Sequence, residues 1–234
     1  MIFYSVSINE IHMFKRYKMA LAEMHCVQPP KLKSNVVNMP ASDGALDLSE
    51  AVTGYPVYQN RVITMKFGSG HVKDEWPFLY SEIQKEFHGK KVKVIFDDDR
   101  GYYYSGRAAV SSYSRKRMVG TLVITVDADP YKYELYDGIE PWRWDPFSFV
   151  DGIIRNYSNI PIRGTGSITV VGRQKHAVPE IICNAPMTLN CEGKTFQLSA
   201  GHTKLYELLL AEGEHVMTFT GNGAVSVLYR GGIL

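Results

Sequence analysis

The stretch Val57-Tyr-Gln-Asn-Arg-Val-Ile-Thr-Met-Lys-Phe67 largely alternates apolar and polar residues and is rich in β-branched and aromatic side chains. A period of two places successive side chains on opposite faces of an extended chain, so one face can be buried while the other meets solvent. This pattern is typical of a strand in an antiparallel sheet with one covered face. The stretch therefore predicts a half-buried β-strand and indicates the fold class of the residues around it.

Further runs of this kind, bounded by Gly, Asn, Asp and Pro, occur on both sides of this stretch and predict strands joined by turns. The clearest are Lys91-Val-Lys-Val-Ile-Phe96, Tyr102-Tyr-Tyr, Gly120-Thr-Leu-Val-Ile-Thr-Val126, Ser167-Ile-Thr-Val-Val171, Thr195-Phe-Gln-Leu198, Val216-Met-Thr-Phe-Thr220 and Val225-Ser-Val-Leu-Tyr229. We therefore expect a mainly β protein. The Gly-rich turns between the later runs favour a β-sandwich in the second half.

One segment, from about Asp74 to His88, has the helical period instead. Its apolar residues Trp76, Leu79 or Tyr80, Ile83 and Phe87 fall on one face of a helix. Asp74 can cap the first turn, Pro77 fits there, and Gly89 can take the left-handed conformation after the end. The spacing predicts the only long helix of the first half, packed across a sheet.

The alternation stops around residues 137–146, where two prolines and a glycine indicate a boundary. We expect an N-terminal domain over residues 1–138 and a C-terminal domain over residues 139–234. The aromatic residues at this junction are expected to pack between the domains, and a sugar-stacking platform is the alternative. They are Trp142, Trp144, Phe147 and Phe149.

Composition excludes several classes of partner. Charged residues make up 21% of the 234 residues and the formal net charge is +2, so no basic excess points to nucleic acid or an anionic membrane. No secretory signal is evident at the N-terminus, and the apolar run Leu208 to Ala211 is far too short to span a bilayer, which predicts folding in the cytoplasm. The three cysteines, Cys26, Cys183 and Cys191, are too few for a disulfide framework and are expected to be reduced thiols, buried or half-buried.

A search for catalytic or metal-binding motifs gives one dense carboxylate cluster, Asp97-Asp98-Asp99. Three acids could bind Ca²⁺ or Mg²⁺, but consecutive acids followed by Arg100-Gly101 are more typical of a hairpin turn. The seven histidines lack zinc-site spacing, and Cys26 belongs to no nucleophile motif. We therefore expect no enzyme, no metal and no cofactor. A glycan-degrading enzyme, with two carboxylates brought together by folding, is the remote alternative.

Several segments, taken in order and spacing, resemble the siphophage distal tail protein (Dit) family over nearly the whole chain. They are Pro40-Ala-Ser-Asp-Gly-Ala-Leu-Asp-Leu48, Arg61 to Phe67, Trp76 with Phe87-His-Gly-Lys90, Val94-Ile-Phe-Asp-Asp-Asp99, Tyr102-Tyr-Tyr-Ser-Gly-Arg107, Asp129-Pro-Tyr-Lys132, Phe219-Thr-Gly-Asn-Gly223 and Val225 to Leu234.

The resemblance implies a split β-barrel related to tail-tube proteins, with one packed helix, followed by a galectin-like β-sandwich. It implies a homo-hexameric ring in the virion tail tip, between the tail-tube protein and the tail-associated hub protein. The tape measure protein and then DNA would pass through its lumen, and no membrane would be involved. Ring contacts are then expected at Asp43, Gly44, Asp47, Arg61, Tyr104 and Arg107.

The chain departs from larger members of that family, which carry inserted carbohydrate-binding modules. Residues 139–234 leave no room for such an insertion beyond the sandwich. The resemblance therefore implies a scaffold to which receptor-binding proteins attach. A galectin-like fold does not by itself confer sugar binding. A host-glycan-binding module of the adsorption apparatus is the alternative function.

Overall fold

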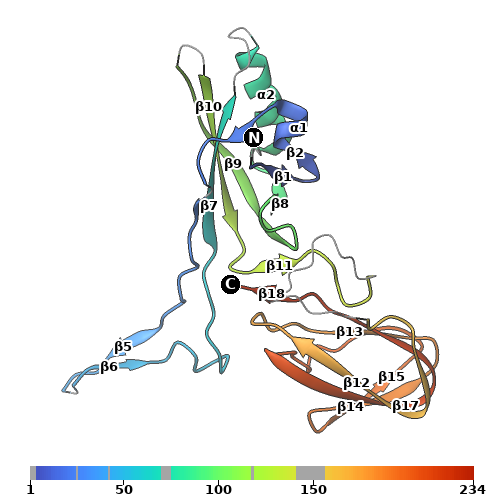
Figure 1. Ribbon diagram of the computed structural model, residues 1–234. Coiled ribbons are helices and arrows are strands. Elements are labelled where there is room, and N and C mark those ends of the chain that lie inside the picture. Colours follow the sequence, from blue (N-terminus) through green and yellow to red (C-terminus); the bar gives the residue numbers. More distant parts are fainter. Residues whose placement is uncertain (1–3, 25, 42, 70–74, 117–118, 141–155) are drawn as a thin grey trace. The chain divides into compact units, whose positions relative to one another are not determined.

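The computed structural model describes residues 4–24, 26–41, 43–69, 75–116, 119–140 and 156–234 (Figure 1). The chain divides into two compact units, the first formed by Met1–Asp98 and Tyr104–Pro130 and the second by Asp99–Tyr103 and Tyr131–Leu234. Strands dominate both units, which confirms the mainly β fold class. The domain boundary expected after residue 138 stays a prediction.

A curved antiparallel sheet forms the body of the first unit, with the strand order β2-β1-β8-β9-β10-β7-β3. A further short strand, β4 (Cys26–Val27), pairs with β7 on the same side as β3. The strands of the main order are β1 (Val6–Ile8), β2 (Ile11–His12), β3 (Ala20–Leu21), β7 (Arg61–Ser69), β8 (Lys91–Phe96), β9 (Tyr102–Lys116) and β10 (Val119–Ala128).

Strand β7 contains most of the stretch that indicated the fold class. Burial alternates along it, with every second residue from Arg61 to Ser69 buried, as the period of two predicts. The strand begins at Arg61, four residues after the start of the sequence pattern. Residues 57–60 belong to the segment that leads into it.

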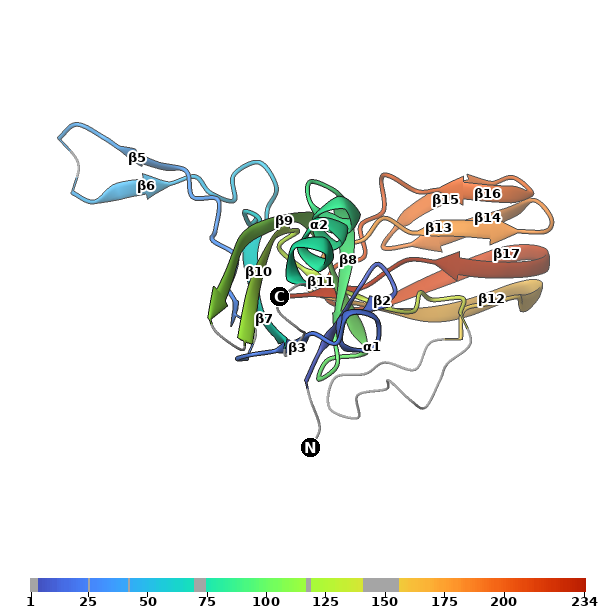
Figure 2. The same cartoon turned by 90° about the horizontal axis from the view of Figure 1, so that it is seen from above.

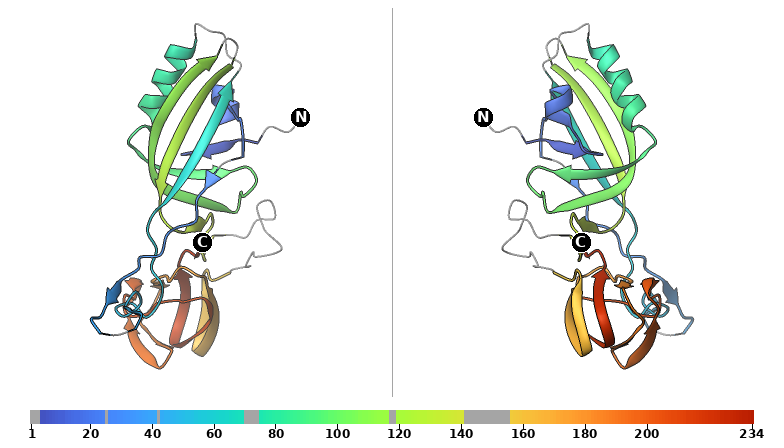
Figure 3. Two further views of the ribbon diagram at one scale, coloured as in Figure 1. Left: turned by 90° about the vertical axis from the view of Figure 1, so that its left-hand side faces the viewer. Right: turned by 90° about the vertical axis from the view of Figure 1, so that its right-hand side faces the viewer.

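The predicted helix is α2 (Trp76–Phe87), which lies along one face of the sheet (Figure 3). Its four buried residues are Trp76, Leu79, Ile83 and Phe87, as the helical period predicts. Gly89 follows with a φ of +75°, the left-handed conformation expected there. The predicted cap, Asp74, lies outside the described residues.

A second helix, α1 (Met13–Tyr17), was not predicted. With five residues it is too short to show a helical period in the sequence. The backbone N–H of Lys15 donates to His12 Nδ1 at its start, and Lys18 ends it in the left-handed conformation. Tertiary burial of Met13 and Tyr17 holds it in place.

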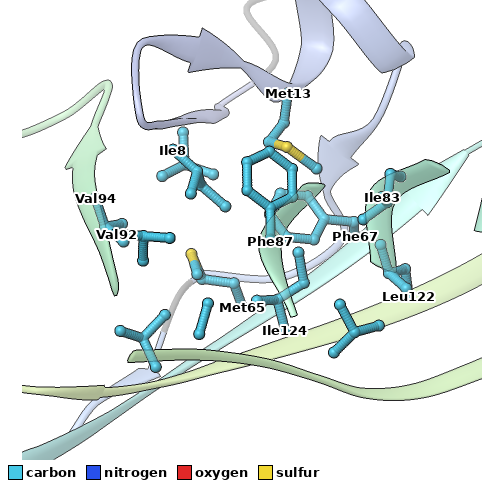
Figure 4. Packing of buried hydrophobic residues seen from close by; sticks show 14 of the residues in the cluster. Ile8, Met13, Met65, Phe67, Ile83, Phe87, Val92, Val94, Leu122 and Ile124 are labelled. Carbon is cyan, nitrogen blue, oxygen red and sulfur yellow. The ribbon is translucent and has the colours of Figure 1, made fainter. Parts of the chain in front are cut away.

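The core of the first unit lies between the two helices and the sheet. Figure 4 shows Phe87 and Ile83 of α2 and Met13 of α1 above Phe67, Leu122 and Ile124 of the strands. At the far end of α2, the Trp76 ring lies against Gly120, where a Cβ atom would come within 1.9 Å of it. Glycine is therefore the residue that lets the helix approach β10 at this point.

The second unit is an all-β structure around one apolar core, with the strand order β15-β14-β17-β13-β16. The long strand β17 also pairs with β12, along the other edge of β17. The core contains side chains from all of these strands except β16. The strands are β12 (Ile160–Gly172), β13 (Glu180–Cys183), β14 (Met187–Cys191), β15 (Lys194–Leu198), β16 (Gly201–Lys204) and β17 (Gly213–Leu228).

Strand β17 corrects the sequence analysis, which predicted two strands separated by a turn near Gly221-Asn-Gly223. The chain stays extended through these glycines because β12 pairs with β17 from Gly213 to Val225. A Cβ atom at Gly223 would lie 2.3 Å from the Asn184 side chain. The glycines therefore permit a close approach within a strand and do not mark a turn.

A small sheet in the second unit joins the start of β9 to β11 (Lys132–Glu134) and to the C-terminal strand β18 (Gly232–Ile233). Ion pairs surround it: Lys132 Nζ lies 2.7 Å from Asp99 Oδ2, and Arg173 Nε lies 2.9 Å from Glu134 Oε1. Arg230 donates to the backbone carbonyl of Glu134 at 2.7 Å. These contacts fix the last residues of the chain to the second unit.

The structure also tests the expectation for the cysteines. Cys183 and Cys191 are buried free thiols, as predicted, whereas the prediction for Cys26 is wrong because its side chain is exposed on β4. A two-residue strand at the edge of a sheet offers no covering layer. The junction aromatics Trp142, Trp144, Phe147 and Phe149 lie outside the described residues. No helix in the described ranges is long and apolar enough to span a membrane.

Candidate functional site

A long hairpin leaves the main sheet of the first unit after β4 and returns to it at β7, and we call residues 28–60 the arm. Its end is a two-stranded sheet of β5 (Val36–Asn38) and β6 (Ala45–Asp47), with Val37 opposite Leu46. Figure 2 shows this hairpin projecting away from the other strands of the unit. Backbone hydrogen bonds tie its two sides together, including Lys33 N to Val57 O at 2.8 Å.

The arm has no core of its own. In residues 28–60, with Ser42 outside the description, every residue is exposed or half-exposed. An isolated two-stranded hairpin is marginally stable in water, and the arm exposes several large apolar side chains that the described residues do not cover. The large apolar side chains that it exposes are Leu32, Val36, Val37, Met39, Leu46 and Val52.

The tip of the arm carries three of the six residues expected at ring contacts. Asp43 and Gly44 are the last two residues of the connection between β5 and β6, and Gly44 has a φ of +76°. Asp47 accepts hydrogen bonds from Ser49 Oγ at 2.5 Å and Ser49 N at 2.9 Å, which lower the pKa of its carboxyl group. The tip thus carries two carboxyl groups, those of Asp43 and Asp47.

Arg61 lies where the arm returns to the sheet, and the structure brings it together with Tyr104. The guanidinium carbon is 5.8 Å from the centre of the Tyr104 ring, and Arg61 is only 5% exposed. Burial lowers the pKa of this guanidinium, while the interaction with Tyr104 acts in the opposite direction. Its buried Nε and Nη2 atoms find no hydrogen-bond acceptor among the described residues, so within this part of the chain the guanidinium is incompletely satisfied.

Arg107 does not join either group. It lies on the exposed face of β9, opposite Lys91 of β8, and its Nη1 donates to the carbonyl of Gly89. This bond connects the start of β8 to β9 after the end of α2. The six expected residues therefore occupy three places: the arm tip, the buried pair at the arm base, and the outer face of the sheet.

Sequence analysis missed the apolar residues of the arm, such as Val36, Val37 and Leu46. A signal was present, because Asp43-Gly44 is a hairpin-turn dipeptide flanked by short apolar runs. Exposure of these side chains could not be inferred, since half-buried and fully exposed strands share the same alternating pattern.

The carboxylate cluster forms the predicted turn between β8 and β9. Its side chains are directed to different partners: Asp97 accepts from the backbone N–H of Ser5 and lies 3.2 Å from His12 Nε2, while Asp99 pairs with Lys132. In the described part of the chain no group of three His, Cys, Asp or Glu side chains is placed to hold a metal ion.

The two buried thiols do not offer a nucleophile. Burial raises the pKa of Cys183, and burial together with the nearby Glu192 raises that of Cys191. A raised pKa disfavours the thiolate, which is the reactive form. Both residues instead contribute to the core of the second unit.

Comparisons with known proteins bear on the fold. No protein-family model matches the sequence, and no curated protein matches it. The structure is similar to the crystal structure of the SPP1 Dit (gp 19.1) protein, described as a paradigm of the hub adsorption apparatus in phages infecting Gram-positive bacteria. The TM-score is 0.61 at 10% sequence identity, and the match covers 99% of each chain. At the level of the fold, this likeness confirms the resemblance found in the sequence.

Proposed function

We propose that this chain is a structural protein of a phage tail tip, a distal tail protein that closes into a homo-hexameric ring in the virion. The supporting observation is a two-unit fold that matches SPP1 Dit over 99% of both chains, together with an arm that lacks a core. The proposed role is mechanical and not catalytic, and assembly would take place in the host cytoplasm.

The arm supports a contact between copies of the chain. Its six exposed apolar side chains are between 41% and 98% accessible. Covering them would contribute on the order of 5 kcal/mol, at about 1 kcal/mol for each partly exposed side chain. An arm that extends from one copy to the next makes a heterologous interface, which closes into a ring when the rotation between copies is a simple fraction of a turn.

The remaining partners follow from the same proposal. The ring would lie between the tail-tube protein and the tail-associated hub protein, with the tape measure protein and DNA passing through its lumen. Receptor-binding proteins would attach at its periphery. A ring that persists in the virion should bury at least about 1,000 Å² between neighbouring copies.

Light scattering on the full chain tests the ring directly, with an expected mass of six times the 26.4 kDa protomer. The informative variant is Val37→Lys with Leu46→Glu, because these residues are opposite each other and an opposite-charge pair preserves the hairpin. It should yield protomers with an unchanged melting temperature. Leu209→Glu, at a residue 42% exposed compared with 48% for Leu46, is the matched control and should leave the hexamer intact.

Cryo-electron microscopy of intact tails is the second test. The proposal expects this chain in a sixfold ring whose arms contact neighbouring copies. A tail tip in which the chain occupies no such ring would contradict the proposal, as would hexamers that persist in the arm double variant.

A further inference from the structure

A loop covers part of the core of the second unit. Residues 205–212 connect β16 to β17, and we call them the leucine loop. The side chains of Leu205, Leu208 and Leu210 are at most 6% exposed and belong to the core. Tyr206 and Leu209, in contrast, are exposed. The leucine loop therefore has one buried side and one side that meets solvent.

Hydrogen bonds hold the leucine loop in place. The backbone N–H of Leu210 donates to the carbonyl of Ala177 at 2.9 Å, and the N–H of Ala177 donates back at 3.1 Å. Close to the start of β17, Nε2 of His215 lies 2.9 Å from the carbonyl oxygen of Ala211, at the end of the loop. This last contact differs from the backbone bonds, because an imidazole gains or loses a proton near neutral pH.

Both nitrogens of the His215 ring face oxygen atoms. While Nε2 faces the carbonyl of Ala211, Nδ1 lies 2.5 Å from Oε1 of Glu192, in the turn between β14 and β15. A carbonyl and an ionised carboxylate only accept hydrogen bonds. A neutral imidazole has one N–H, so it can donate to one of these oxygens and turns a lone pair toward the other. A doubly protonated ring donates to both.

The surroundings of the ring favour this additional proton. His215 is 6% exposed, and a buried charge is tolerated when it is paired and hydrogen-bonded, as it is here by a carboxylate and a carbonyl. The exposed Glu212 and Glu214, close to it in sequence, add negative potential. A proton on Glu192 would satisfy the same two contacts. In either form the pair holds one proton more than a neutral imidazole beside a carboxylate.

Other titratable groups lie on the elements around the ring. Burial, and then the charge of His215, lower the pKa of His176, so His176 is the imidazole that stays neutral. Burial, and then Glu192, raise the pKa of Cys191, so its thiol stays protonated. Cations on these elements have partners of their own: the Glu207 carbonyl for Lys194, Glu134 for Arg173, and the Tyr133 ring for Lys175.

We infer that His215 and Glu192 form a pH switch, in which one added proton closes the leucine loop over the core and its loss loosens the loop. Without the proton a nitrogen lone pair faces an oxygen, and one of the two hydrogen bonds of the ring is lost. The folded unit gains from the bound proton, so by linkage the contact contributes in full in acidic solution and is lost as the pH rises. Rising pH therefore uncovers the leucines of the loop.

Hydrogen exchange of the full chain, measured by mass spectrometry, tests the switch on the peptide that covers the leucine loop. The amide of Leu210 is bonded to Ala177, so its exchange reports opening of the loop. Rates are compared at about pH 5.5 and about pH 8.5, on either side of the free histidine value, after division by the intrinsic rate at each pH. We expect protection to fall by about tenfold at the higher pH, as for the loss of a hydrogen bond to a charged group.

Three variants give the test its specificity. His215→Gln cannot hold the proton, so its loop should exchange about tenfold faster than the original at the lower pH and like the original at the higher pH. Glu192→Gln keeps an acceptor oxygen and removes the charge, so loosening should begin about one pH unit lower; it also serves if His215→Gln does not fold. His202→Gln is the matched control, because this ring pairs with Glu180 at 2.7 Å but is 65% exposed, and it should exchange like the original at both pH values.

The outcomes separate this inference from the proposed function. Corrected exchange that is equal at both pH values would refute the switch, as would a Glu192→Gln chain that loosens at the same pH as the original. His215 would then be a neutral ring with a purely structural role. Every readout comes from within the second unit, so failure of the ring would leave the switch standing, and failure of the switch would leave the ring unaffected.

Discussion

Trp76 offers the sharpest test of how the first unit is held together. Its side chain is 1% exposed, between Gly120 of β10 and Tyr113 of β9, with ring centres of Trp76 and Tyr113 5.5 Å apart. A buried aromatic ring covers about 150–250 Å², which at about 25 cal/mol per Å² corresponds to about 4–6 kcal/mol. Trp76→Ala should therefore lower the free energy of unfolding by about 3–5 kcal/mol.

Gly120 makes the test specific for this contact. A Cβ atom at Gly120 would overlap the benzene part of the Trp76 indole, so Gly120→Ala should cost about 1–3 kcal/mol by overpacking. In a Trp76→Phe background the overlapping atoms are absent, because the phenyl ring is shorter than the indole. The same glycine substitution should then cost at least about 1 kcal/mol less.

Scanning calorimetry and urea denaturation of the four chains in this cycle, and of Trp76→Ala, give the free energies. For a chain of this length, the Trp76→Ala change corresponds to a melting temperature lower by about 10 °C. Two results would refute the reasoning. One is a Trp76→Ala protein as stable as the original, and the other is an equal cost of Gly120→Ala in both backgrounds.

Three further predictions follow from the charged groups. Arg61→Met should leave the single chain as stable or more stable in urea denaturation, because it removes a buried guanidinium of which two nitrogens have no partner among the described residues. A loss above about 2 kcal/mol would contradict this unpaired state. Ca²⁺, Mg²⁺ or a chelator should leave the melting temperature unchanged in a thermal shift assay, because Asp97 and Asp99 already have protein partners. Hydrogen bonds from Ser49 lower the pKa of Asp47, so its contribution to the arm is complete above the unfolded value of about 3.9 and is lost as the pH falls through the lower folded value. NMR titration of the Ser49 amide measures this, and a midpoint above 3.9 would be the contrary result.

The sequence predicted those elements whose burial follows a regular period. Helix α2 has an apolar residue every three or four positions, and β7 and β8 alternate along their whole length, so the core face of each could be assigned. Helix α1 spans little more than one turn, which no period can reveal. It forms because Met13 and Tyr17 enter a core that the distant parts of the chain create.

The glycines of β17 show a different limit. Gly221-Asn-Gly223 has the composition of a turn, and only pairing with β12, with Met187 and Asn184 packed above it, keeps the segment extended. Glycine is equally required where a chain reverses and where another group approaches closely. Local sequence therefore could not distinguish the two, and the single strand β17 was predicted as two strands.

The candidate site was predictable as a set of residues but not as an arrangement. Arg61 and Tyr104 are 43 positions apart and meet because β7 and β9 both pair with β10. Asp43, Gly44 and Asp47 were singled out through a resemblance, and their common place on an extended arm follows only from the structure. Whether a side chain is exposed depends on which parts of the fold cover it, and this could not be inferred from the local sequence.

The energetics of the arm lead back to the proposal that the chain acts in an assembly. Ordering a residue costs about 1–2 kcal/mol of backbone entropy, and most of that cost is normally offset by burial of apolar surface. Residues 28–60 obtain cross-arm hydrogen bonds but bury no side chain among those described. The balance can become favourable when another molecule covers Val36, Val37 and Leu46. In a closed ring every copy would insert its arm into one neighbour and receive the arm of the other. The arms of all six copies would then be covered, and no interface would be left open.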